Sequence, residues 1–191
     1  MEFRVVGPGD AQALAEMFSD IDETFFRPHP FTESEAMRIA DQVGKDAYAI
    51  LLDGQRPVAY GMLRGWDEGY RTPSLGIAVR TDSQGRGFGR LMMAHLHAEA
   101  RRRGAVQVRL RVHPDNIRAR RLYESIGYEY AGEDRGELRR RAWAGVPSAV
   151  PRGTAATRRP RAGAAIASRG LERRSRLRCR SRTAASGAVP T

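Results

Sequence analysis

The chain has 191 residues, of which 33 are Lys or Arg and 22 are Asp or Glu, so its net charge is +11. The charge is unevenly distributed: residues 1–134 carry 18 basic and 20 acidic side chains, a net of −2, whereas residues 135–191 carry 15 and 2, a net of +13. A near-neutral domain with a basic tail gives no reason to expect nucleic acid at an active site. The single cysteine, Cys179, excludes a disulfide framework and a cysteine-ligated metal cluster.

The sequence also argues against a membrane partner. No apolar stretch approaches the roughly 18–20 residues that cross a bilayer, and the N-terminus lacks the apolar segment of a signal peptide. We therefore expect a cytoplasmic protein with one domain of ordinary size.

The first half of the sequence predicts two helices and antiparallel strands. Thr32 and Glu35 form a capping box at the start of the second helix, and the proline-rich stretch 25–31 before it is expected to be a loop. An Asp-Gly pair, residues 53–54, predicts a hairpin turn between two apolar strands. The expected helices run from residue 10 to about 21 and from 32 to 44, and the expected strands are 3–6, 47–52, 58–63 and 74–80.

The second half predicts a parallel α/β arrangement. A glycine-rich loop, 84–89, opens a helix that ends at Gly104. An alternating strand at 106–112, a helix over about 116–126 and a short strand at 128–131 complete the pattern.

Beyond residue 137 the sequence changes to Arg, Ala, Gly, Ser and Pro without periodicity. Such a stretch cannot bury enough apolar surface to offset its chain entropy, so we expect a folded domain over 1–137 and a disordered tail over 138–191. Residues 137–143 include three consecutive arginines and would make a poor strand at a position that other elements cover. Two alternatives for the tail are a basic arm that binds nucleic acid or anionic lipid, and a frameshift near codon 138 of a GC-rich gene.

The loop 84–89 is a candidate phosphate site. Consecutive backbone N–H groups at a helix start, with the positive end of the helix dipole, bind anions. A dinucleotide fingerprint that begins at Gly85 fails because position 90 is Arg90. A Walker loop is excluded as well, because the chain's only lysine, Lys45, lies elsewhere.

Two motifs on this framework resemble those of the GNAT superfamily of coenzyme A-dependent N-acyltransferases. Gln84-x-x-Gly87-x-Gly89 is similar to the family's Q/R-x-x-G-x-G/A coenzyme A loop. The second, Asn116-x-x-Ala119-x-x-Leu122-Tyr123-x-x-x-Gly127-Tyr128, is similar to the family's other signature helix. The resemblance covers about residues 2–137. It implies an α/β GNAT fold, a mixed and mostly antiparallel sheet whose central parallel strand pair splays apart between flanking helices.

The resemblance also implies acetyl-CoA (coenzyme A) as the cofactor. Backbone groups of one splayed strand would bind the pantetheine arm, the loop amides would bind the pyrophosphate, and Asn116 would contact the pantetheine or cysteamine portion. The residues expected to bind the cofactor are Ile77, Ala78, Val79, Gln84, Gly85, Arg86, Gly87, Phe88, Gly89, Arg90, Asn116 and Tyr123.

In catalysis, Tyr123 matches the family's general acid, which protonates the departing thiolate. The base that takes the proton of the incoming amine is expected among Glu68, Asp67 and His29, with Glu68 taken as the catalytic residue. The expected acceptor-binding residues are His29, Phe31, Trp66, Asp67 and Tyr70. No metal site is expected, because His95 and His97 point about 200° apart on a helix.

We expect transfer of an acetyl group to a primary amine of a small molecule, such as an amino sugar on which Trp66 and Tyr70 could stack, by direct attack in a ternary complex. One alternative is a peptide or protein N-acetyltransferase, which needs an open groove. Another is a non-catalytic module that binds coenzyme A or nucleic acid. The sequence leaves a homodimer open.

Overall fold

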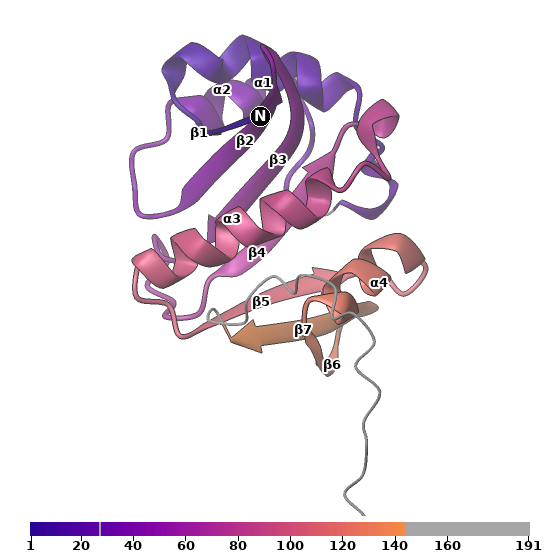
Figure 1. Cartoon of the computed structure of the whole chain (residues 1–191). Helices are drawn as coiled ribbons and strands as arrows, with labels where there is room; N and C mark the ends of the chain where they lie inside the picture. Colours follow the sequence, from indigo (N-terminus) through magenta and orange to yellow (C-terminus); the bar gives the residue numbers. More distant parts are fainter. Residues whose placement is uncertain (27, 144–191) are drawn as a thin grey trace, which may run out of the picture. The chain divides into compact units, whose positions relative to one another are not determined.

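A computed structural model describes residues 1–26 and 28–143 of the chain. Seven strands form one sheet in the order β1-β2-β3-β4-β5-β7-β6, and helices cover it (Figure 1). The strands are β1 (Glu2–Val5), β2 (Ala47–Asp53), β3 (Arg56–Arg64), β4 (Ser74–Val79), β5 (Gln107–Val112), β6 (Glu129–Asp134) and β7 (Glu137–Trp143). The helices are α1 (Ala11–Ser19), α2 (Glu33–Ala40), α3 (Phe88–Arg102) and α4 (Ile117–Ser125).

The central strand pair splays apart. All neighbouring strands are antiparallel except β4 and β5, which are parallel. These two strands pair only at Ser74 and Arg109, next to a hydrogen bond from the Arg109 N–H to the Pro73 carbonyl at 3.0 Å. Beyond this point β4 and β5 no longer pair. The predicted fold class, a mostly antiparallel sheet with a splayed central pair flanked by helices, is confirmed.

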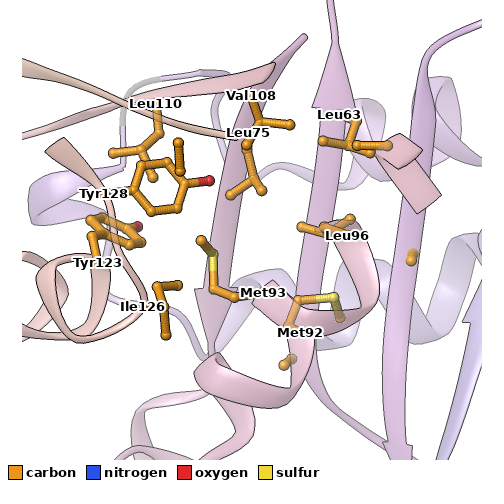
Figure 2. Packing of buried hydrophobic residues seen from close by; sticks show 14 of the residues in the cluster. Leu63, Leu75, Met92, Met93, Leu96, Val108, Leu110, Tyr123, Ile126 and Tyr128 are labelled. Atoms are coloured by element: carbon orange, nitrogen blue, oxygen red, sulfur yellow. The ribbon is translucent and has the colours of Figure 1, made fainter. Parts of the chain in front are cut away.

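Each face of the sheet carries its own apolar cluster. Along β2, Ala49 and Leu51 join the cluster of α3 and α4, whereas Ile50 between them joins the cluster of α1 and α2. This separation follows from the alternation of side chains along a strand. Figure 2 shows the first cluster, with Met92 and Met93 of α3 packed beside the strands. The helices α3 and α4 therefore lie on one face of the sheet, and α1 and α2 on the other.

Helix α2 is shorter than the sequence predicts. The Thr32 hydroxyl accepts a hydrogen bond from the Glu35 N–H at 3.2 Å, as expected of its half of a capping box. The helix ends at Ala40 rather than at residue 44. Val43, near the end of the expected helix, is 99% exposed, so its side chain adds no buried apolar surface that would stabilise a further turn.

The described domain extends past the predicted boundary at residue 137. Strand β7 lies between β5 and β6, where a poor strand was expected. Its inward positions include Arg140, which is buried and donates to the Glu124 carboxylate at 2.7 Å. An arginine at an inward position hides the alternation that would have identified the strand. Residues 144–191, which hold most of the predicted tail, lie outside the described residues.

Candidate active site

A cleft of about 1030 Å³ opens where β4 and β5 diverge. Its walls come from these two strands, β7, the start of α3 and one side of α4, together with the turn after β3 and residues of the segment before α2. Small-molecule pockets usually measure about 300–1,000 Å³. The cleft therefore has room for a large cofactor together with part of a second reactant.

The glycine loop forms the end of the cleft at α3. Gly85 and Gly87 have φ angles of +81° and +87°, in the left-handed region that glycine adopts at little cost. No atom lies within 4 Å of the position of a Cβ at either residue. Leu91 is the first residue of α3 whose N–H donates back along the helix, to the Gly87 carbonyl at 3.1 Å. The amides before it are the orphan donors of a first helical turn, which are available to an anion.

The predicted pantetheine-binding residues Ile77, Ala78 and Val79 line the cleft. Their strand pairs with β3 on its other edge, so the edge that faces the cleft has no strand partner beyond Ser74. At Gly89, a Cβ would stand 3.4 Å from Leu122 of α4 and 3.7 Å from Ile77. Glycine at this position allows the start of α3 to approach both α4 and β4.

Tyr123 of α4 also lines the cleft. Its side chain is 6% exposed, and its ring lies 5.7 Å from the ring of Tyr128. Burial raises the pKa of the Tyr123 phenol above its ordinary value. The hydroxyl has no hydrogen-bond partner among the described residues. The arrangement thus holds a protonated phenol at the cleft wall with its O–H free to donate.

The remaining predicted cofactor residues differ in placement. Gln84, Gly85, Gly87, Phe88, Gly89, Arg90 and Asn116 line the cleft, whereas Arg86 does not. Arg86 lies 3.5 Å from the Asp53 carboxylate and 4.8 Å from the centre of the Phe88 ring. Asn116 also caps α4, because its side-chain oxygen accepts from the Ala119 N–H at 3.1 Å.

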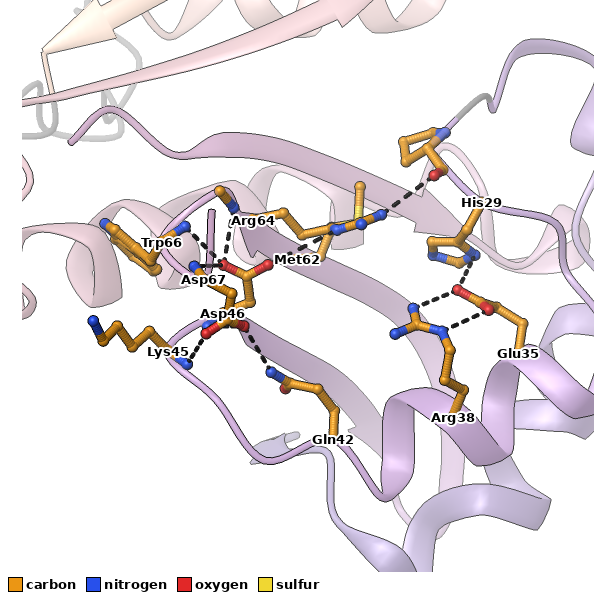
Figure 3. A network of polar contacts seen from close by, with 12 residues as sticks. His29, Glu35, Arg38, Gln42, Lys45, Asp46, Met62, Arg64, Trp66 and Asp67 are labelled. Atoms are coloured by element: carbon orange, nitrogen blue, oxygen red, sulfur yellow. Dashed lines mark hydrogen bonds and ion pairs between the residues drawn. The ribbon is translucent and has the colours of Figure 1, made fainter. Parts of the chain in front are cut away.

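In the turn after β3, two of four predicted residues reach the cleft. Glu68 and Tyr70 line it, whereas Trp66 and Asp67 do not. The Asp67 carboxylate accepts from the Lys45 N–H at 2.7 Å and from the Asp46 N–H at 3.2 Å, as Figure 3 shows in part. These hydrogen bonds, that from Lys45 first, lower the pKa of Asp67. Asp67 therefore has a role in holding the turn, and Trp66 packs on the core below the guanidinium of Arg103.

His29 and Phe31 do not line this cleft either. His29 is buried, where Nδ1 donates to the Pro30 carbonyl at 2.8 Å and Nε2 lies 3.0 Å from the Tyr60 hydroxyl. Desolvation lowers the pKa of His29 below its ordinary value. Phe31 packs in the α1–α2 cluster, 4.7 Å from the ring of Phe18. Both residues anchor the loop that the sequence correctly placed between the first two helices.

Two features of the site carry no signal that could be recognised in the sequence. The Asp46 carboxylate accepts from the amides of Gly65 and Trp66, each at 2.9 Å, and so holds the turn that carries Glu68. No local motif marks this residue. The second feature is a set of four arginines from β5 and β7 that line the cleft and that we call the arginine face: Arg109, Arg111, Arg139 and Arg141.

Among the described residues, no group of three His, Cys, Asp or Glu side chains is arranged to hold a metal ion. In the same part of the chain, no helix is long and apolar enough to cross a membrane. The cleft itself is lined by backbone amides, the Tyr123 phenol and charged side chains.

Comparison with known proteins yields a family match and related structures. The sequence model of the Acetyltransferase (GNAT) family matches residues 14–128. Over 55 residues the chain is 46% identical to the [ribosomal protein bS18]-alanine N-acetyltransferase of Salmonella typhimurium. That match covers 29% of this chain and 37% of the relative, so the chain spans well under two thirds of that protein.

Several solved structures share the fold at low sequence identity. The GNAT domain of S. lividans PAT has a TM-score of 0.65 at 18% identity, over 74% of this chain and 89% of that one. The ribosomal-protein-S18-alanine N-acetyltransferase of Escherichia coli has a TM-score of 0.60 at 21% identity, over 80% and 98%. The PaiA N-acetyltransferase of Thermoplasma acidophilum, solved in complex with coenzyme A, has a TM-score of 0.61 at 11% identity, over 75% and 99%.

Proposed function

Because the chain belongs to the GNAT family of acetyltransferases, which use acetyl-CoA, we propose that it transfers an acetyl group from acetyl-CoA to the amino-terminal amine of a polypeptide. The choice of acceptor rests on the 46% identity to a ribosomal-protein-alanine N-acetyltransferase. From the sequence we expected a small-molecule amine as the acceptor, with a peptide acceptor as the alternative. The similarity supports that alternative better.

The residues at the start of α3 fit the diphosphate of acetyl-CoA. The left-handed backbone at Gly85 and Gly87 and the open space beside both residues leave room for phosphate oxygens. Amides of residues 85–90 would bind them, while the unpaired edge of β4 at residues 77–79 would hold the pantetheine arm. Bound there, acetyl-CoA supplies the acetyl group as a thioester.

Two side chains would move the protons. The Tyr123 O–H donates a proton to the departing sulfur, and its raised pKa keeps it protonated at neutral pH. The Glu68 carboxylate, which also lines the cleft, accepts the proton that the amine loses. After one turnover Tyr123 has lost one proton and Glu68 has gained one, so exchange with water restores both groups.

The placement of Trp66 argues against the amino-sugar acceptor. Stacking on a sugar ring called for Trp66 and Tyr70 together, but only Tyr70 lines the cleft. Tyr70 is 55% exposed, and the Arg109 guanidinium lies 5.1 Å from its ring centre. A flat tyrosine beside a cationic side chain suits a polypeptide backbone with polar side chains as well as it suits a sugar.

The proposal is tested by measuring kcat/KM of the full chain with acetyl-CoA and a panel of amines. The panel holds peptides with a free amino terminus, the same peptides with a blocked amino terminus and an internal lysine, and amino sugars. We expect peptides with a free amino terminus to exceed the other amines by at least about tenfold. Mass spectrometry should place the acetyl group on the amino-terminal nitrogen.

Two results would contradict the proposal. Turnover of amino sugars alone would restore the small-molecule acceptor. Binding of coenzyme A in calorimetry without turnover of any amine would indicate a non-catalytic module. The variant Tyr123→Phe serves as the control, because it should bind coenzyme A with unchanged affinity while it loses turnover.

A further inference from the structure

The arginine face is made by two directly opposed pairs. In the register of β5 and β7, Arg109 faces Arg141, and Arg111 faces Arg139. Opposed residues of an antiparallel pair project from the same side of the sheet, so the four side chains form one group. All four are exposed and line the cleft.

These pairs have little compensation from neighbouring carboxylates. Like charges directly opposite each other destabilise a sheet. Glu129 of β6 stands directly opposite Arg141, and Asp134 and Glu137 share this side of the sheet at its outer turn. Only Arg111 has a carboxylate within ion-pair distance among the described residues, namely Asp134 at 3.1 Å. The other three arginines line the cleft and make no ion pair with any side chain in residues 1–26 and 28–143.

The two strands have room for these side chains. A Cβ at Gly132 of β6 would stand 2.9 Å from the Arg139 guanidinium, so glycine there makes space for this arginine. The Arg109 guanidinium rests on the Tyr70 ring, which orients it at the only point where β4 and β5 pair. The positive charge is thus held in position rather than spread over the surface.

The arginine face lies on the side of the sheet away from the cofactor loop. Val108 and Leu110 of β5 belong to the apolar cluster of α3 and α4, so Arg109 between them projects from the opposite side. Helix α3, whose first turn carries the anion site, packs on the former side. A reactant that enters from the side opposite to α3 contacts the arginines before it reaches β4.

We propose that the acceptor is a polypeptide with acidic residues close to its amino terminus, and that the arginine face binds those carboxylates. This inference rests on the proposed acetylation of an amino-terminal amine. Strand β7 lies two strand spacings, about 10 Å, from β4 where the sheet is paired, a distance that an extended peptide covers in about three residues. The acidic residues therefore belong at about the second to fifth positions of the acceptor.

The test uses three peptides with the same first residue and free amino terminus. Positions two to five are acidic in one, glutamine and asparagine in the second, and arginine in the third. The full chain is compared with the double variant Arg109→Gln/Arg141→Gln. A matched control, Arg101→Gln/Arg121→Gln, removes two exposed arginines that do not line the cleft. Fluorescence anisotropy of the labelled acidic peptide, with coenzyme A present, measures binding independently of turnover.

The unchanged protein should favour the acidic over the neutral peptide by about tenfold in kcat/KM at low salt, and less as the salt concentration rises. The double variant should lose this preference to within about twofold, with an unchanged KM for acetyl-CoA, whereas the control should keep it.

Equal turnover of the three peptides would overturn the inference and leave the proposed function standing. Acetylation of small amines alone, with no binding of the acidic peptide, would overturn both. A raised KM for acetyl-CoA in the double variant would assign the arginines to the cofactor and overturn the inference. Loss of RNA binding in the double variant, with peptide turnover unchanged, would assign the face to a phosphate backbone and overturn it too.

Discussion

The sheet has two halves that differ in how they are covered. In the half that contains β2 and β3, nearly every residue is buried, because α1 and α2 lie on one face and α3 on the other. In the half that contains β5 and β7, only alternate residues such as Val108 and Leu110 are buried. The uncovered face of this second half carries the arginine face and borders the cleft.

Because of this difference, one half of the sheet contributes mainly to stability and the other half offers side chains to a ligand. A strand that is buried on both faces contributes packing energy at every residue, whereas a strand with one open face leaves alternate side chains free for a ligand. Substitutions in the doubly covered half should therefore change the free energy of unfolding. Substitutions on the open face or at the cleft wall should change kinetic constants instead.

The largest effect on stability is expected from Ile50→Ala in β2. Ile50 is fully buried, so its truncation should lower the free energy of unfolding by about 2–5 kcal/mol, measured by urea titration. The activity of the folded fraction should be unchanged. Arg109→Ala on the open face should alter stability by no more than about 0.5 kcal/mol. Equal losses from the two variants would contradict the division between the halves.

Tyr123→Phe should lower the activity strongly and change the stability little, the reverse of Ile50→Ala. Loss of the proposed general acid should lower kcat by about 10²–10⁴-fold. Stability should change by less than about 1 kcal/mol, because the hydroxyl makes no hydrogen bond with the described residues. Since burial raises the pKa of Tyr123, its phenol stays protonated above pH 10, and kcat of the unchanged protein should show no fall caused by this group between about pH 8 and 10. A variant that keeps its full kcat would remove the acid role.

Gly87→Ala should affect both stability and the binding of acetyl-CoA. The φ angle of +87° disfavours any side chain, so the free energy of unfolding should fall by about 1–2 kcal/mol. The KM for acetyl-CoA should rise as well. Gly54→Ala is a matched control, because Gly54 also has a positive φ, +63°, in a hairpin turn away from the cleft. If both variants change stability and neither changes KM, the loop does not bind the cofactor.

The smallest effect concerns His29, which packs against the doubly covered half. Its pKa is lowered by burial, so the neutral ring of the folded state contributes stability above the ordinary pKa of 6.5 that is lost as the pH falls through the folded pKa. Urea titrations at about pH 7.5 and 5.5 should show a smaller loss on acidification for His29→Gln than for the unchanged protein. The variant's kcat at pH 7.5 should stay the same, and a large fall would place His29 in the reaction.

Much of the fold could be predicted from the sequence, and so could the loop and the helix that form one end of the cleft, because the signals are local. The amides of the loop that contains Gly85 and Gly87 are consecutive in the chain and therefore lie close together. The motif around Tyr123 lies on and next to one helix. Prediction failed where a contact between distant segments decides the outcome. Helix α2 ends before Val43, whose side chain is exposed. Arg140 occupies an inward position of β7, where it pairs with Glu124 of α4.

The sequence by itself determined the order of the elements and predicted an anion-binding role for the loop 84–89, since each depends on residues within one short segment. The packing of the helices brought Tyr123 to the same cleft as this loop. Only the tertiary structure decided which acceptor-side residues reach the cleft. Glu68 lines it and its neighbour Asp67 does not, because amides of the segment before β2 bind the Asp67 carboxylate. The arginine face likewise exists only through the pairing of β5 with β7, which brings together charges that are about thirty residues apart in the chain.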